Sequence, residues 1–119
     1  MSRMPAPLKP SSVDQDRLDR IHAMPCIACY IEGYKSQCGR TEAHHIVFNG
    51  YRRLSGGHAS TIPLGAFHHR GEPLPGYTKS QMTFVFGPSL ALNKRAFIGK
   101  YGIELDLLKL TNKLMGDSV

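Results

Sequence analysis

The cysteines constrain this 119-residue chain more than any other feature. Cys26 and Cys29 have the C-x-x-C spacing with which two thiolates bind one tetrahedral metal ion, and Cys38 and His68 can supply the two remaining ligands. Three cysteines do not pair into a disulfide framework, so the count favours a reducing compartment and a metal. These four residues predict a structural zinc site. Two small buried cysteines or a redox pair would also give a C-x-x-C spacing, and that alternative stays open.

Two adjacent histidine pairs, His44-His45 and His68-His69, form the second feature. Neighbouring residues of a strand point to opposite faces, so His44 and His45 cannot share one role. That division suits a site in which one imidazole binds a metal and the next acts as a base. His68 and His69 lie near an expected helix start, where they diverge by about 100 degrees. We therefore expect one of them to face the cysteines and the other to face His44.

The positive charge is concentrated in the middle of the chain. The net charge is +6, and residues 33–102 carry nine Lys and Arg against two Glu, a local net of +7. Within that segment Arg52 and Arg53 lie in a glycine-containing loop, where guanidinium groups and close backbone approach suit phosphate binding. A solvated hairpin tip is the alternative for this loop. The distribution predicts an anionic partner, with nucleic acid as one candidate and a merely solvated basic face as the other.

The order of the expected elements indicates one small α+β domain. We expect residues 1–12 to form a flexible arm and residues 13–119 to form the domain. No apolar run is long enough for a membrane span or a signal peptide, so we expect a cytoplasmic protein. The expected elements are a helix over 13–23 capped by Ser12, strands over 43–48 and 61–64 joined by the loop 49–60, a helix from 65 or 66, a connection over 71–81, a helix from Pro88 to Gly102, and a last helix to about Met115.

Four motifs occur in a specific order along most of the chain. They are C-x-x-C, then A-H-H-I, then a Gly/Arg loop with a histidine, then I-P-L-x-x-x-H-H-R-G. Together they resemble the HNH nucleases in their ββα-metal form, and more narrowly the phage Ref-type, RecA-dependent nucleases, over about residues 24–110. The resemblance implies a small, zinc-stabilised, treble-clef-like core with flanking helices.

The same resemblance implies a role for each histidine of the later motifs. His44 would bind the catalytic divalent metal, and His45 would be the general base that takes a proton from the attacking water. His69 would be a second metal ligand at the helix start. His58 would orient the base or the substrate. An imidazole that titrates near neutrality suits a base, which agrees with the role given to His45.

Further expectations concern the ions, the substrate and the partners. The catalytic ion would be Mg²⁺ or Mn²⁺, with Zn²⁺ able to take its place, beside the structural Zn²⁺. The substrate would be single-stranded or duplex DNA, contacted by Arg52, Arg53 and Arg70, and its phosphodiester bonds would be hydrolysed. A RecA-type recombinase filament would be a partner in phage recombination or DNA processing, and no membrane is involved.

The chain departs from the family pattern at two positions. Relatives follow I-P-L with a cysteine, where this chain has Gly65, so Cys38 would have to supply the missing thiolate. Relatives also carry a further histidine shortly before a helix like the one that begins with Lys94-Arg95-Ala96-Phe97, and Ala91 falls closest to that position in this chain. Two alternatives to an endonuclease therefore stay open. One is a zinc-stabilised module that binds DNA or a recombinase without cutting, and the other is a protein whose histidines bind zinc only for folding.

Overall fold

A computed structural model describes residues 11–46 and 59–116 of the chain. The expected arm, except for its last two residues, and the residues His58, Arg52 and Arg53 lie outside the described part. No helix among the described residues is long and apolar enough to cross a membrane. The elements in chain order are α1 (Ser12–Ala23), α2 (Ile27–Glu32), β1 (Thr41–His45), β2 (Thr61–Gly65), α3 (Ala66–Arg70), α4 (Lys79–Phe86), α5 (Lys94–Tyr101) and α6 (Glu104–Leu114).

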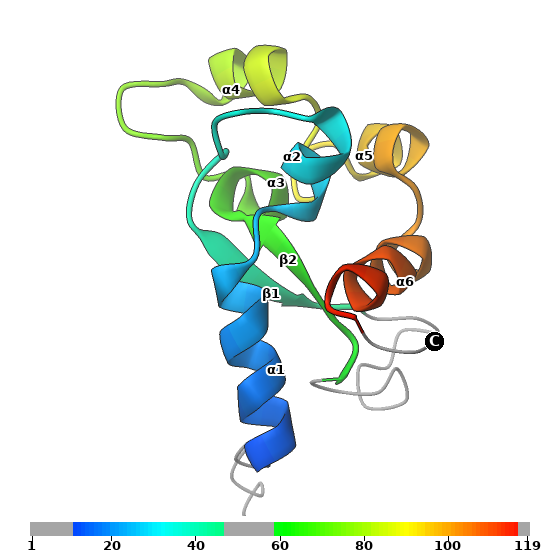
Figure 1. Ribbon diagram of the computed structural model, residues 1–119. Coiled ribbons are helices and arrows are strands. Elements are labelled where there is room, and N and C mark those ends of the chain that lie inside the picture. Colours follow the sequence, from blue (N-terminus) through cyan, green and yellow to red (C-terminus); the bar gives the residue numbers. More distant parts are fainter. Residues whose placement is uncertain (1–10, 47–58, 117–119) are drawn as a thin grey trace, which may run out of the picture.

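A two-stranded antiparallel sheet and the helix that follows it form the centre of the fold (Figure 1). β1 pairs with β2 in a register that sets Thr41 opposite Gly65 and His45 opposite Thr61. α3 begins at the residue after β2, and the amide of Ala66 donates to the carbonyl of Arg40, 2.9 Å away, which ties the helix start to the strand pair. This β-β-α order confirms the predicted α+β fold class.

The two faces of the sheet contact different helices. Arg17 of α1 donates from Nε and Nη2 to the hydroxyl and the carbonyl of Thr61, at 2.9 and 2.8 Å. Glu104 of α6 contacts His44, 3.0 Å away, from the other face. Because directly opposed residues of an antiparallel pair point to the same side, His45 shares the α1 face with Thr61, whereas His44 shares the α6 face with Ile62.

The apolar core lies between the sheet, α2 and the helices that follow the sheet. Its largest fully buried side chains include Phe67, Phe97, Ile62, Leu64 and Met82. They come from β2, α3, α4 and α5, so the core joins the sheet to the C-terminal half of the chain. Burial of such side chains is the main favourable contribution to folding in a domain of this size, which the buried cysteines supplement.

Two helix starts differ from the sequence predictions. The first helix is capped by Ser11 rather than Ser12, because Ser11 and Asp14 form reciprocal side-chain to backbone hydrogen bonds. α4 occupies Lys79–Phe86, partly within the connection expected over 71–81, because Thr78 and Gln81 form a second capping box. Both boxes satisfy amide groups that a helix start would otherwise leave unpaired.

The helix expected from Pro88 to Gly102 is shorter than predicted. It begins only at Lys94, because residues 90–92 form a turn in which the Ser89 hydroxyl accepts from the amide of Leu92, 3.0 Å away. Asn93 then adopts φ −142° and ψ 60°, which is not helical. The turn and this residue separate Ser89 from the helix. The strand predicted over 43–48 begins two residues earlier, at Thr41, and ends at His45.

Candidate metal centres

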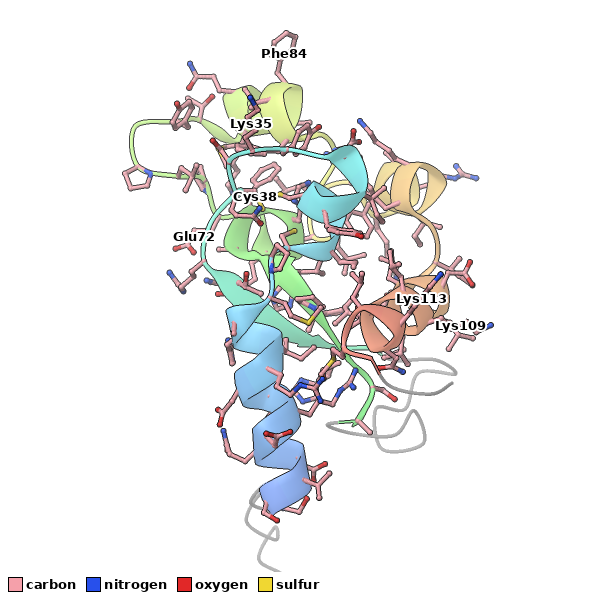
Figure 2. The ribbon with its side chains drawn as sticks, in the orientation of Figure 1. Lys35, Cys38, Glu72, Phe84, Lys109 and Lys113 are labelled. Atoms are coloured by element: carbon pink, nitrogen blue, oxygen red, sulfur yellow. The ribbon has the colours of Figure 1, made fainter. Side chains whose placement is uncertain are left out.

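Three cysteines and one histidine gather in the interior of the protein. Cys26 caps α2, Cys29 lies within α2, Cys38 lies in the segment before β1 and His68 lies in α3. Figure 2 shows Cys38 between α2 and α3. All four side chains are fully buried, and their sulfur and nitrogen ligand atoms lie within 4.8 Å of one another. The four residues singled out from the sequence therefore form one cluster.

The separations within this cluster suit a tetrahedral zinc ion. His68 Nδ1 lies 3.0, 3.4 and 3.7 Å from the sulfurs of Cys38, Cys26 and Cys29. The sulfurs of Cys38 and Cys26 are 3.9 Å apart. Ligands of a tetrahedral zinc ion lie about 3.8 Å apart for two sulfurs and about 3.6 Å apart for sulfur and nitrogen, given the usual bond lengths. The donor set and its spacing thus fit zinc.

A second contact fixes which nitrogen of His68 faces the sulfurs. His68 Nε2 lies 2.9 Å from the carbonyl oxygen of Phe86, which only accepts hydrogen bonds. Nε2 therefore carries a proton, and Nδ1, which faces the cysteines, is the nitrogen left to bind a metal once its own proton is displaced. A backbone carbonyl in this position is a common way to orient a metal-binding imidazole.

The protonation of the cluster is strongly shifted. Hydrogen bonds with Cys29 and Cys38 hold the pKa of Cys26 far below its usual range, whereas the pKa of Cys29 is raised by its hydrogen bonds with Cys26 and Cys38 and by burial. Burial works to lower the pKa of His68, but its hydrogen bonds with Cys26 and Cys38 outweigh this effect and raise the pKa to about 10. The buried groups share protons that a divalent cation would replace.

A second site, where His44 meets His69, lies on the α6 face of the sheet. His44 Nδ1 and His69 Nε2 are 3.2 Å apart, and the two rings meet edge to face with centroids 4.9 Å apart. Two nitrogens bound to one ion at about 2.1 Å lie about 3.0 to 3.4 Å apart, depending on whether the ion is octahedral or tetrahedral. As expected from the helical spacing, His68 faces the cysteines and His69 faces His44.

Glu42 and Glu104 contact the outer nitrogens of these two rings. Glu104 Oε2 lies 3.0 Å from His44 Nε2, and Glu42 Oε1 lies 2.9 Å from His69 Nδ1. The four side chains are mostly buried, with 17% to 23% of each exposed. Sequence reasoning singled out neither glutamate. Glu42 could have been found, because it lies two residues before His44 on a strand and so points to the same face.

Arg70 holds Glu42 in place. Its guanidinium donates to both carboxylate oxygens of Glu42, at 2.8 and 2.7 Å, and to Glu72 at 2.9 Å. These hydrogen bonds with Arg70, against the opposing effect of burial, lower the pKa of Glu42 to about 2. Burial lowers the pKa of His69, which favours the neutral imidazole that a metal requires. DNA contact by Arg70 stays a prediction, and such contact would compete with its two carboxylate partners.

His45, the expected base, lies on the opposite face of the sheet from His44. It is half-buried, and its strand partner is Thr61, to which Arg17 donates. The two neighbouring histidines therefore have separate surroundings, as the alternation of a strand requires. Arg17 brings a guanidinium group to the α1 face. Its contact with Thr61 was not predictable from the sequence, because α1 and β2 are far apart in the chain.

A comparison with protein families extends these observations to nearly the whole chain. Residues 10–116 match the family model described as "Recombination enhancement, RecA-dependent nuclease". The chain belongs to this RecA-dependent nuclease family. No curated protein has a significant sequence match to it. The matched region includes both histidine pairs, the cysteine cluster and all six described helices.

Gly65, the last residue of β2, lies against the cysteine cluster. A Cβ atom at Gly65 would lie 2.4 Å from the Cys38 sulfur and 3.4 Å from Cys26 Cβ. The Cys38 sulfur thus occupies space that a side chain at position 65 would need. Cys38 joins the cluster from the segment before β1, and only glycine at position 65 leaves its sulfur enough room.

Replacing Gly65 by alanine is expected to displace the Cys38 sulfur. Overpacking of this kind costs about 1 to 3 kcal/mol of unfolding free energy. Denaturant unfolding and the zinc content of the purified protein measure both effects. Gly99→Ala is the control, because a Cβ at this helical position has no atom within 4 Å, and the change should stabilise the protein by up to about 1 kcal/mol. A Gly65→Ala protein with parental stability and full zinc content would show that the sulfur is not held there.

Ala91, the position where the resemblance led us to expect a metal-binding histidine, lies exposed in the turn before α5. A methyl group offers no ligand atom, so the turn supplies none at this position.

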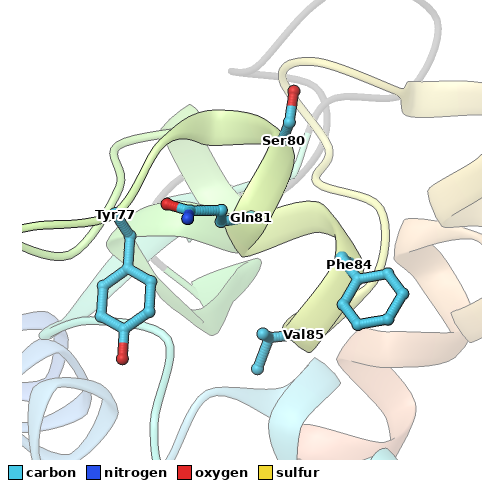
Figure 3. Close-up of a pocket in the computed structure, with 5 residues that line it drawn as sticks. All are labelled: Tyr77, Ser80, Gln81, Phe84 and Val85. Atoms are coloured by element: carbon cyan, nitrogen blue, oxygen red, sulfur yellow. The ribbon is translucent and has the colours of Figure 1, made fainter.

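A shallow hollow of about 370 Å³ lies on and beside α4, lined by Tyr77, Ser80, Gln81, Phe84 and Val85 (Figure 3). Its lining contains no histidine, cysteine or acidic side chain and so offers no metal site.

Proposed function

We propose that the protein is a metal-dependent HNH-type endonuclease that hydrolyses phosphodiester bonds in DNA. The observation that carries this proposal is the 3.2 Å approach of His44 Nδ1 to His69 Nε2, with the outer nitrogen of each ring on a carboxylate. Two imidazoles arranged in this way suit a divalent cation. Membership of the RecA-dependent nuclease family supports the assignment to phosphodiester chemistry.

In this proposal the cysteine cluster holds a structural zinc ion. The zinc ion would link α2, the segment before β1 and α3 through Cys26, Cys29, Cys38 and His68. These segments adjoin the residues of the second site. His68 and His69 are adjacent in α3, so the zinc ion would also fix the position of the helix from which His69 extends. Four protein ligands close the coordination shell, as in structural rather than catalytic zinc sites.

His44 and His69 would hold the second ion, which we take to be Mg²⁺ or Mn²⁺, with Zn²⁺ able to replace it. When bound, this ion supplies positive charge to the scissile phosphate and to the departing 3'-oxygen. His45 would accept the proton of the attacking water, and His58 would orient His45 or the substrate. Because His44 and His45 point in opposite directions, the scissile phosphate and the attacking water would have to lie at the end of β1, where His45 is the last strand residue, so that both side chains reach them.

The substrate contacts are assigned to the basic middle segment of the chain. Arg52, Arg53 and Arg70 would contact the phosphates of single-stranded or duplex DNA, which positions the backbone without reading the sequence. The description of the family supports a RecA-type filament as partner in DNA recombination or processing. Reduced thiols and a DNA substrate suit a cytoplasmic location, and we propose that residues 13–119 act as one domain.

Changing His69 to alanine tests this function. The zinc-loaded parent should nick supercoiled DNA in the presence of Mg²⁺ or Mn²⁺, with and without a RecA filament as separate arms. His69→Ala should cut at least about 100-fold more slowly, because a site with one imidazole fewer holds the ion poorly. Titration with Mn²⁺ should show the matching loss of affinity. His22→Ala is the control, since His22 is exposed on α1 and its Nδ1 lies 3.1 Å from the backbone carbonyl oxygen of Thr41, away from both histidines of the site.

One observation favours a second function, a DNA-binding or recombinase-associated module without cleavage. Ala91 offers no ligand atom where the resemblance implies a histidine, so the second site would rest on fewer protein ligands. In that case the parent would bind DNA with an affinity that falls steeply with salt, because phosphate contacts release counterions. Binding without cleavage under every ion, with or without the filament, would overturn the endonuclease proposal and support the module.

A further inference from the structure

We infer that Glu104 and Glu42 are positioning residues that fix the tautomers of His44 and His69, so that both imidazoles direct a lone pair at the same ion. The inference rests on the proposed function, because it assumes that these two histidines bind the divalent metal. It goes beyond that function by assigning a task to α6, whose first residue is Glu104. Neither carboxylate is proposed as a ligand of the ion.

The first step of the argument concerns His44. An ionised carboxylate only accepts hydrogen bonds, so the 3.0 Å contact between Glu104 Oε2 and His44 Nε2 requires the proton on Nε2. His44 Nδ1 then carries a lone pair. That nitrogen is the one that faces His69.

The same reasoning applies to His69 with the nitrogens exchanged. Glu42 Oε1 lies 2.9 Å from His69 Nδ1, so the proton is on Nδ1 and the lone pair is on Nε2. The lone pairs of His44 Nδ1 and His69 Nε2 therefore face each other across 3.2 Å. Two lone pairs at this separation repel, and the arrangement becomes favourable when a cation lies between or beside them. A metal ion supplies that cation, and a single proton shared by the two rings is the competing occupant.

Both carboxylates are themselves held in place. Arg70 donates two hydrogen bonds to the Glu42 carboxylate, and Arg40 Nη2 lies 3.4 Å from Oε2 of the same group. Glu104 lies in the first turn of α6, where the positive end of the helix favours a negative charge. The ring of His44 thus lies between a carboxylate on α6 and the lone pair of His69. Such outer contacts typically change metal affinity 10- to 100-fold.

The experiment reads the tautomers directly and then measures binding. Long-range ¹H–¹⁵N spectra of the zinc-loaded protein at neutral pH should show His44 protonated on Nε2 and His69 protonated on Nδ1. Mn²⁺ is then titrated calorimetrically into the parent, Glu104→Ala, Glu104→Gln and Asp106→Ala proteins. Asp106 is the matched control, since it lies in the same first turn and carries the same charge but is exposed to solvent.

Glu104→Ala is expected to lower Mn²⁺ affinity about 10- to 100-fold and to leave His44 as a mixture of tautomers. Glu104→Gln should keep most of the affinity, because its amide oxygen still accepts from Nε2–H, and Asp106→Ala should match the parent. A His44 proton on Nδ1 in the parent, or Glu104→Ala binding as tightly as the parent with the same thermal unfolding, would overturn the inference. A proton shared between the rings that Mn²⁺ does not displace would overturn it too. Failure of the parent to bind Mn²⁺ at all would instead refute the proposed metal site, so the two failures are distinguishable.

Discussion

Removal of zinc by a chelator at neutral pH should convert the folded protein into a largely unfolded chain. The apparent binding free energy of a structural zinc ion is about 10 to 16 kcal/mol in small zinc-binding peptides, whereas whole domains are stable by only about 5 to 15 kcal/mol. The four proposed ligands are fully buried and come from α2, the segment before β1 and α3, so the ion would hold separate segments of the chain together. Loss of the ion should therefore cost more than the rest of the domain can supply.

Circular dichroism and amide spectra measure this loss, with metal analysis to count the zinc released. Addition of zinc to the chelated protein should restore the spectra, whereas Mg²⁺ should not, because thiolates prefer zinc to magnesium. Cys29→Ser should give a protein that unfolds at a much lower temperature and holds less than one zinc ion. A protein that keeps its fold without zinc would show that the cluster is an ordinary set of buried cysteines.

The His45→Ala protein should lose about 100- to 10,000-fold in the rate of DNA cleavage, the usual contribution of a general base. It should keep its zinc ion and its Mn²⁺ affinity, because His45 points to the α1 face of the sheet and His44 to the α6 face. Cleavage rates under single-turnover conditions, measured beside a Mn²⁺ titration, separate these effects. Slow cleavage with unchanged Mn²⁺ affinity distinguishes a base from a ligand, since His69→Ala should lose both cleavage and Mn²⁺ affinity.

Two controls accompany this variant. His22→Ala should cleave at the parental rate, which shows that loss of a histidine elsewhere has no effect. Adding imidazole to His45→Ala should restore part of the activity if the missing group is a base. A His45→Ala protein that cuts DNA as fast as the parent would show that another group activates the water.

Local features of the sequence predicted which side chains meet. The offset between His68 and His69 depends only on helix geometry, so the direction of one toward the cysteines and of the other toward His44 could be anticipated. The fold class followed from the strand, loop and helix order. Cys38 is the only cysteine outside the C-x-x-C motif, which made it the candidate for a third thiolate, and its position in the cluster confirms that prediction.

Contacts between distant segments were not predictable from one sequence. Glu104 reaches His44 only because α6 packs across the sheet, and no spacing in the chain indicates that approach. The start of α4 is a different case, because the spacing of Thr78 and Gln81 is that of a capping box and could have been used to predict it. The early start assigned to the helix before Gly102 was wrong because Ser89 begins a turn instead of the helix itself.

The contact between Gly65 and Cys38 also restricts how such a protein can evolve. A chain with cysteine at both positions is overcrowded, because a Cβ at position 65 would lie 2.4 Å from the Cys38 sulfur. A chain with cysteine at neither position has a cluster with one ligand too few. Any lineage that moves the thiolate between positions 38 and 65 must pass through one of these two weakened intermediates. Members of the family should therefore fall into two separate groups, each with its own source of the thiolate, and chains of mixed type should be rare.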